Sequence, residues 1–95
     1  MWESAEEFGA LLIFAEHRYY GTSLPYDAGT KGCMSFLTSE QAMADFAYLI
    51  DNLRQQDGAA KSPIIGFGGS YGGMIGAWFR VHYPNVRRRW WRWWQ

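Results

Sequence analysis

The segment from residue 62 to residue 83 places a short apolar run, a glycine-rich turn and a helical pattern directly one after another. The run from Ser62 to Phe67 (Ser-Pro-Ile-Ile-Gly-Phe) has the length and composition of a short buried strand. The pattern from Gly72 to Tyr83 predicts a helix, and Pro84 ends it because proline cannot continue a helix. This order predicts a strand, with its core at residues 64–67, that turns into a helix within a few residues.

A second pair of the same kind precedes it. The apolar run from Ala10 to Ala15 is typical of a strand buried on both faces of a parallel sheet. Thr38 to Gln41 has the form of a capping box, and apolar residues then recur at three- and four-residue spacing as far as Leu53. Asp57-Gly58 is a turn signal that ends this helix. Strand, helix, strand, helix predicts an α/β fold with a parallel sheet and flanking helices.

The connections and the chain start carry their own signals. Residues 1–8 indicate a helix, which Gly9 stops. The stretch from Glu16 to Met34 is a long loop, and long loops in compact domains are usually functional.

A single cysteine, Cys33, cannot form an internal disulfide, and no histidine or second cysteine lies at a zinc-site spacing. We therefore expect no metal and no cofactor.

The composition changes abruptly after Val86. Residues 87–95 hold no acid, and they hold four of the nine basic residues and four of the six tryptophans. The body before them keeps five basic and nine acidic residues, a net charge of −4 against +4 in the tail. Interleaved arginine and tryptophan is typical of peptides that bind membranes and, less often, of modules that stack on nucleic acid bases. Tryptophan has the single codon TGG, and if the arginines use CGG, a one-base shift reads the same DNA as an Ala/Val run or a Gly run. We therefore favour a frame slip or a misplaced exon boundary as the origin of the tail.

The sequence Gly68-Gly-Ser-Tyr-Gly72 fits the G-x-S-x-G pattern, in the strand–turn–helix setting that gives the pattern meaning. We predict that Ser70 is a nucleophile and that the backbone N–H of Tyr71 stabilises an oxyanion at the helix N-terminus. We expect Gly68, Gly72 and Gly73 to leave room for the serine, and Gly69 is the fourth glycine of the motif.

The alternatives for this turn are a plain glycine-rich connection or a phosphate-binding loop. A dinucleotide-binding fingerprint counted from Gly66 would put Tyr71 at its third glycine, so that pattern fails. A Walker A loop fails because no Gly-Lys-Ser/Thr follows.

A second constellation follows the first apolar run. We expect this loop to pack beside an active site, and its residues are Glu16, His17, Arg18, Tyr19, Tyr20 and Gly21. His17 is better read as a histidine held by loop hydrogen bonds than as a catalytic base, which needs an orienting acid and reach to the serine. His82 lies twelve residues beyond Ser70, roughly 18 Å along a helix, and is not the base.

Three motifs together resemble one family. They are Glu16 to Pro25 (Glu-His-Arg-Tyr-Tyr-Gly-Thr-Ser-Leu-Pro), Leu37 to Ala47 around Thr-Ser-Glu-Gln-Ala, and Gly68 to Met74, followed by Arg80 and Tyr83-Pro84. They are similar to the family of lysosomal Pro-X carboxypeptidase, dipeptidyl peptidase II and thymus-specific serine protease, over residues 1–86. The resemblance implies a serine exopeptidase of the α/β-hydrolase fold, with a peptide substrate cleaved near its end, commonly after proline, and Ser70 as the nucleophile.

The resemblance also implies what the chain lacks. The family's catalytic Asp and His lie far downstream, so we expect residues 1–86 to be a partial hydrolase core with an incomplete sheet, carrying the serine and inactive alone. Residues 87–95 depart from the family, which continues there as an Ala-rich strand. We expect no nucleic acid partner, weak membrane contact through the tail at most, and a lysosomal or secreted location, although no signal peptide opens the chain. Two alternatives are a binding module acting through residues 87–95 and a short isoform that pairs with a full-length enzyme.

Overall fold

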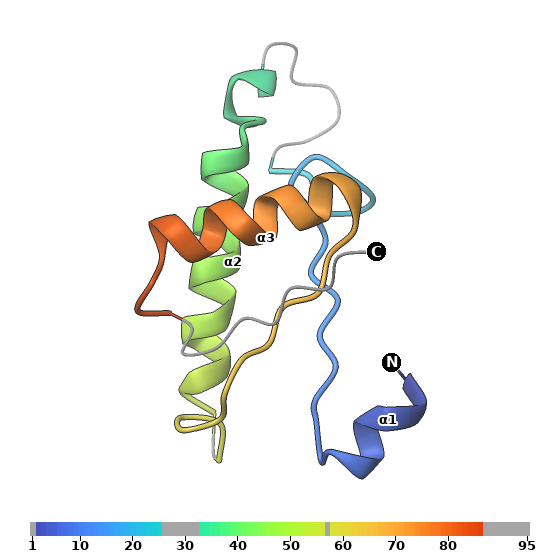
Figure 1. The fold of residues 1–95 in the computed structure, drawn as a ribbon. Coiled ribbons are helices and arrows are strands. Elements are labelled where there is room, and N and C mark those ends of the chain that lie inside the picture. The colour runs from blue at the N-terminus through green and yellow to red at the C-terminus, as the bar shows by residue number, and fades with distance from the viewer. Residues whose placement is uncertain (1, 26–32, 57, 87–95) are drawn as a thin grey trace. The chain divides into compact units, whose positions relative to one another are not determined.

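The computed structural model describes residues 2–25, 33–56 and 58–86 (Figure 1). The chain divides into two compact units, residues 1–31 and residues 32–95, which are described one at a time below. The first holds the helix α1 (Trp2–Glu7), and the second holds the 3₁₀ turn η1 (Cys33–Phe36) and the helices α2 (Ser39–Arg54) and α3 (Ser70–His82).

In the first unit, α1 ends at a glycine, as predicted. Gly9 has a φ of 57°, a left-handed conformation that glycine adopts without a steric penalty. The N–H of Gly9 donates to the carbonyl of Glu6 over 3.0 Å, and the N–H of Ala10 donates to the carbonyl of Ala5 over 2.8 Å. This pair of bonds is a Schellman motif, which satisfies two carbonyls left open at the end of the helix. Residues 10–25 then continue without a helix or a strand.

In the second unit, α2 begins where the capping pattern places it. Thr38 is the N-cap residue, with extended backbone angles, and its hydroxyl accepts the N–H of Gln41 over 3.2 Å. The predicted helix start is therefore confirmed. The helix ends at Arg54, three residues before the turn signal, because the N–H of Gln55 bonds to the carbonyl of Asn52 and tightens the last turn. Asp57 itself lies outside the described residues, and Gly58 has a φ of 82°.

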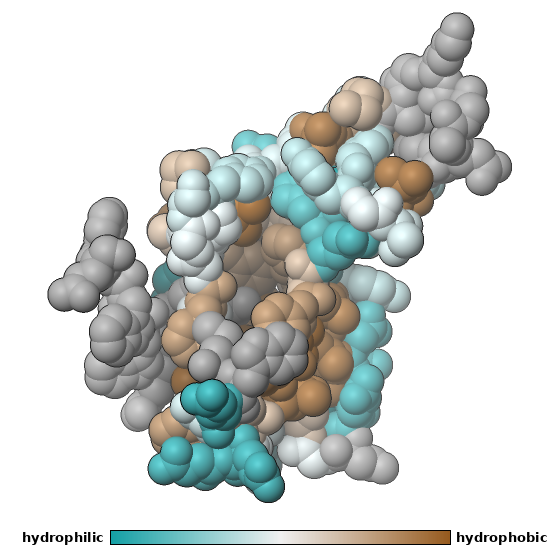
Figure 2. All heavy atoms as spheres, turned by 90° about the vertical axis from the view of Figure 1, so that its right-hand side faces the viewer, coloured by the Kyte–Doolittle hydropathy of each residue, from teal (hydrophilic) through white to brown (hydrophobic). Residues whose placement is uncertain are grey.

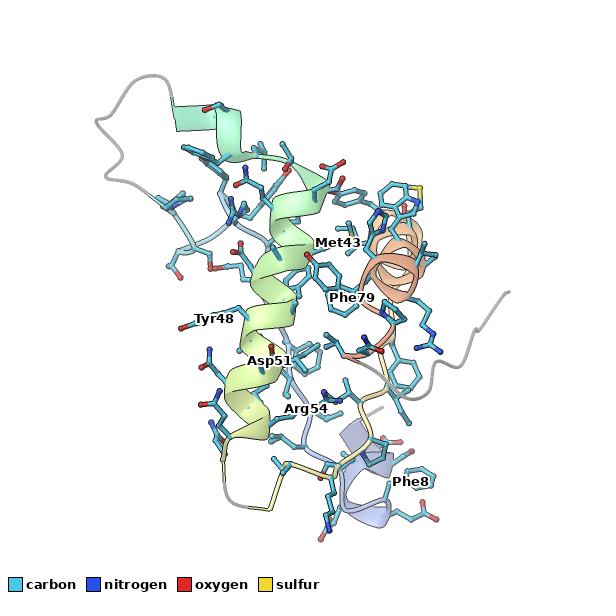
Figure 3. The ribbon with its side chains drawn as sticks, turned by 90° about the vertical axis from the view of Figure 1, so that its left-hand side faces the viewer. Phe8, Met43, Tyr48, Asp51, Arg54 and Phe79 are labelled. Atoms are coloured by element: carbon cyan, nitrogen blue, oxygen red, sulfur yellow. The ribbon has the colours of Figure 1, made fainter. Side chains whose placement is uncertain are left out.

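The core of the second unit lies between α2 and α3, and α3 crosses α2 (Figure 1). Figure 3 shows Met43 and Phe79 pointing toward each other from the two helices, whereas Tyr48 points away from α3. Met43 and Phe79 are each only 2% exposed. The other buried members of this core are Ala47, Ile50 and Ile75. The apolar stripe predicted for α2 is therefore buried, but its partner is a helix and not a sheet.

The segment after α3 closes this core. Pro84 follows the C-cap residue Tyr83, so the predicted end of the helix is confirmed. The ring of Tyr83 stacks on that of Phe79 at a centroid distance of 4.9 Å. The guanidinium of Arg54 donates to the carbonyl of Val86, and this bond joins the end of α2 to the chain beyond α3.

The predicted parallel sheet is wrong for this chain. Within residues 2–25, 33–56 and 58–86 no segment is a strand, and the regular elements are helices. The run from Ala10 to Ala15 leaves Leu11 74% exposed, and in the second run Phe67 is 58% exposed. Figure 2 shows brown, apolar atoms exposed in the middle of the face that it presents. An apolar run becomes a strand only when a neighbouring strand pairs its N–H and C=O groups, and the pattern of one segment does not supply that neighbour.

Candidate active site

Ser70 is the first residue of α3 and has a strained backbone. Its φ is 51°, in the left-handed region that residues other than glycine seldom adopt, and this conformation costs about 1–3 kcal/mol. The N-cap residue Gly69 is extended, with φ −111° and ψ 154°. The chain therefore turns sharply from an extended segment into a helix at Ser70, two residues earlier than the helix start predicted at Gly72. The segment before the turn is extended without being a strand.

Close approach of the backbone explains two of the motif glycines. A Cβ atom on Gly68 would lie 2.6 Å from both the carbonyl carbon and the carbonyl oxygen of Gly72, far inside van der Waals contact. A Cβ atom on Gly73 would lie 3.0 Å from the carbonyl oxygen of Gly68. The N–H of Gly73 donates to the carbonyl of Gly69 over 3.2 Å and closes the first turn of α3. The close approach of the backbone before and after Ser70 thus requires glycine at position 68, whereas at position 73 a side chain would be tightly placed and the neighbouring carbonyl would have to move by a few tenths of an ångström.

The other two motif glycines are not required by space. A Cβ atom on Gly69 or on Gly72 would meet no atom within 4 Å. The expectation that the absence of a side chain at Gly72 makes room in this turn is therefore wrong. The positions where a side chain would meet neighbouring backbone are Gly68 and Gly73.

The two residues proposed for chemistry are accessible. Ser70 is exposed, and Tyr71 is 45% exposed. Both lie in the first turn of α3, where backbone N–H groups point out of the helix end and carry its partial positive charge. Such an end suits an oxyanion that develops next to the serine. The assignment of the Tyr71 N–H to that task remains a prediction.

Within the second unit, His82 is not placed as the partner of Ser70. His82 lies at the opposite end of the thirteen-residue helix α3, and its Nδ1 lies 2.9 Å from the carbonyl oxygen of Trp78. His17 belongs to the first unit, where its Nδ1 lies 2.8 Å from the carbonyl oxygen of Arg18. Its ring also contacts that of Tyr20 edge to face at 5.3 Å. These contacts are those of a histidine held by its own loop.

Glu16 organises the loop from residue 16 to residue 23. Its Oε2 atom accepts the N–H of Thr22 over 3.2 Å, the N–H of Ser23 over 3.0 Å and the hydroxyl of Ser23 over 2.6 Å. The hydroxyl of Thr22 lies 3.5 Å from the same oxygen. These bonds, led by that from the Ser23 hydroxyl, lower the pKa of the Glu16 carboxyl from its ordinary value. Glu16 was expected in this loop, but its partners Thr22 and Ser23 were not predicted, although two hydroxyl residues after a glycine were a usable signal.

The same carboxylate explains the glycine of the loop. Gly21 has a φ of 55°, and a Cβ atom there would overlap the carboxylate of Glu16. Tyr19 has a φ of 69° and donates its N–H to the carbonyl of Ser23 over 2.8 Å. Tyr19 and Ser70 are the two residues other than glycine with a positive φ in the parts of the chain that the structure describes. Hydrogen bonds therefore hold this loop in a defined conformation, in which the backbone of Tyr19 is strained.

Metal-binding clusters and membrane-spanning helices are both absent from the residues that the structure describes. These residues contain no group of three or more His, Cys, Asp or Glu side chains placed to hold a metal ion. They also contain no helix with the length and hydropathy needed to cross a membrane.

Comparison with known proteins gives the family of this chain. The family described as Serine carboxypeptidase S28 matches residues 1–88, and the chain belongs to it. The chain is 57% identical over 90 residues to lysosomal Pro-X carboxypeptidase of Homo sapiens and 56% identical to that of Pongo abelii. It is 44% identical over 91 residues to prolyl carboxy peptidase like protein 5 of Caenorhabditis elegans. Each match covers 90% of this chain and 18% of the relative.

The family membership confirms the resemblance read from the three motifs. The chain spans 18% of the length of these curated relatives, so it corresponds to one segment of them.

Proposed function

We propose that this chain carries the nucleophile segment of a serine-type exopeptidase that cleaves peptides near their ends, commonly after proline. The observation that carries the proposal is the left-handed backbone of Ser70 at the start of α3, made possible by the close approach at Gly68. Strain of this kind is kept where a nucleophile must stand clear of its surroundings. The names of the relatives support a carboxypeptidase with proline on the acyl side of the cleaved bond.

In the proposed reaction the hydroxyl oxygen of Ser70 attacks the carbonyl carbon of the scissile peptide bond. A general base takes the hydroxyl proton, and the N–H of Tyr71 stabilises the negative charge that develops on the carbonyl oxygen. The C–N bond then breaks, the base gives its proton to the leaving amine, and water hydrolyses the acyl-enzyme. We propose that the base and its orienting acid come from a part of the peptidase outside these 95 residues, because His82 lies roughly 18 Å along α3 from Ser70.

A chimera tests the proposal. Residues 2–86 of this chain replace the homologous segment of human lysosomal Pro-X carboxypeptidase, and turnover of a chromogenic peptide with a proline before the cleaved bond is measured. We expect turnover that Ser70→Ala abolishes. The matched control is Ser62→Ala, because Ser62 is exposed and its hydroxyl makes a long hydrogen bond, 3.4 Å, to the carbonyl of Gly58. A folded chimera without turnover, or equal activity in the two variants, would contradict the proposal.

The 95-residue chain alone is expected to show no turnover, because a serine without its base is a weak nucleophile. Turnover by the chain alone that Ser70→Ala removes would keep Ser70 as the nucleophile and make His17 the base.

The location of the protein is part of the same proposal. Several relatives are named lysosomal Pro-X carboxypeptidase, which supports a lysosomal location for this protein. Secretion is the alternative location that the family resemblance implies. The alternative function, a binding module in residues 87–95, falls on residues outside those that the structure describes and stays an untested alternative. Deleting residues 87–95 should abolish binding to anionic vesicles if the tail makes the weak membrane contact, since arginine and tryptophan favour that surface. Unchanged vesicle binding would assign it to the body.

A further inference from the structure

The apolar run from Ala10 to Ala15 lies exposed in the first unit. Leu11 is 74% exposed, Ile13 50% and Phe14 66%. Single exposed apolar side chains are ordinary on a protein surface, whereas a contiguous run of them marks a surface that associates. The six residues from position 10 to position 15 hold no charge, no proline and no glycine. Segments of this composition pair readily with copies of themselves.

The backbone of the run is also open to a partner. In Figure 1 the run is an uncoiled trace that follows α1. The N–H of Ala10 donates to the carbonyl of Ala5 in α1. By contrast, the N–H and C=O groups of Leu11, Leu12 and Ile13 make no backbone hydrogen bond within the part of the chain that the structure describes. Such a row of unpaired groups is a template for another strand, so a second molecule can supply the neighbour that the run lacks.

The charges at the two ends of the run favour an antiparallel pair. Before the run, α1 carries Glu3, Glu6 and Glu7 and has no basic residue in its last turn. After the run come Glu16 and Arg18, whose charges cancel. A parallel pair would place the three glutamates of one copy beside those of the other, and like charges side by side are destabilising. An antiparallel pair instead places each acidic end beside the end that carries the arginine.

We propose that residues 10–15 pair antiparallel with residues 10–15 of a second copy of this chain, so that the chain forms a dimer. Alignment about the midpoint between Leu12 and Ile13 places Leu11 of each copy opposite Phe14 of the other. Both copies then use the same surface, as two-fold symmetric dimers do. The pairing needs neither Ser70 nor a substrate. Because two strands alone are only marginally stable, monomer and dimer exchange in equilibrium.

Sedimentation velocity of the complete 95-residue chain over a range of concentrations measures this association. We expect the mean mass to rise from that of one copy toward that of two. Leu11→Lys should raise the dissociation constant of the dimer about tenfold or more, because each dimer then holds two ammonium groups in place of apolar side chains. The matched control is Val81→Lys, since Val81 is also 74% exposed but lies on α3 in the second unit. This control should leave the dissociation constant unchanged, and circular dichroism should show equal helix content in both variants.

Disulfide cross-linking tests the orientation, and it also covers the case in which Leu11→Lys does not fold. Chains with Leu11→Cys and chains with Phe14→Cys, both also carrying Cys33→Ser, are mixed and oxidised. An antiparallel pair brings position 11 of one copy opposite position 14 of the other, so we expect mixed disulfides. Two cysteines at position 11 would lie at least roughly 10 Å apart in that pair, at about 3.3 Å a residue, whereas a disulfide needs Cα atoms within about 7 Å.

Four results would overturn the inference. The first is a chain that stays monomeric at every concentration, and the second is equal weakening by Leu11→Lys and Val81→Lys. The third is cross-linking mainly between two cysteines at position 11, which a parallel pair gives. The fourth is association that deletion of residues 87–95 abolishes and Leu11→Lys leaves unchanged, because the dimer would then form through the tail.

Discussion

Replacing Gly68 by alanine should open the turn that presents Ser70. The added Cβ atom would lie 2.6 Å from the carbonyl carbon and oxygen of Gly72, whereas contacts of this kind are ordinary only beyond 3.4 Å. The clash is with backbone, so no side chain can move aside, and the chain before Ser70 must separate from the first turn of α3 by roughly the missing 0.8 Å. Forcing an extra carbon into a close contact costs about 1–3 kcal/mol.

The measurement is amide exchange of the Gly73 N–H, whose bond to the carbonyl of Gly69 closes that first turn at 3.2 Å. A cost of about 1–3 kcal/mol corresponds to exchange roughly 5- to 140-fold faster. Gly72→Ala is the matched control, since its Cβ atom meets nothing within 4 Å, and alanine within a helix is favoured over glycine by about 0.5–1 kcal/mol. Similar exchange rates in the two variants would refute the packing argument.

Three further predictions concern stability and pH. Thr38→Ala should cost about 1 kcal/mol of unfolding free energy in a urea titration, because the N–H of Gln41 loses its acceptor, and Thr38→Ser should be close to neutral. Phe79→Ala should cost about 3–5 kcal/mol and abolish any cooperative transition, whereas Val81→Ala on the same helix, 74% exposed, should stay within about 0.5 kcal/mol. Because the pKa of Glu16 is lowered from 4.5, its contribution to the loop should be complete above pH 4.5 and lost as the pH falls through the lower folded value. The Ser23 amide shift in an NMR titration should report this, and Glu16→Gln should remove the step.

The helices could be predicted because their signals act over a few residues. Gly9 ends α1 and Thr38 begins α2 through hydrogen bonds that span three to five positions, which a sequence displays directly. The spacing of Met43, Ala47 and Ile50 likewise shows which face of α2 is buried. What the spacing does not reveal is the element that covers this face. We expected a sheet, and the covering residues are Ile75 and Phe79 of α3.

The prediction of a sheet was wrong because a strand depends on a partner segment that can lie far away in the sequence. The run from Ala10 to Ala15 has the composition of a strand, but a strand also needs a neighbouring strand to pair with. The composition of one segment does not show whether such a neighbour is present. At the site, the sharp turn at Ser70 could be predicted from its glycines. Which glycine is indispensable could not, because the contact between Gly68 and Gly72 depends on how closely two backbone segments approach in space. The bonds from Ser23 to Glu16 were missed because they join residues seven apart in an irregular loop, where no periodicity helps.

The overlap between the carboxylate of Glu16 and any side chain at position 21 has an evolutionary consequence. A side chain at position 21 would displace the carboxylate of Glu16 from its bonds to Ser23. A shortening of Glu16 would remove this overlap, though not the restriction that the φ of 55° imposes on position 21. The two positions should therefore drift as a pair, with the acid changing first. A lineage that has lost the acid should be the one in which asparagine or aspartate, which tolerate a left-handed backbone, replaces the glycine.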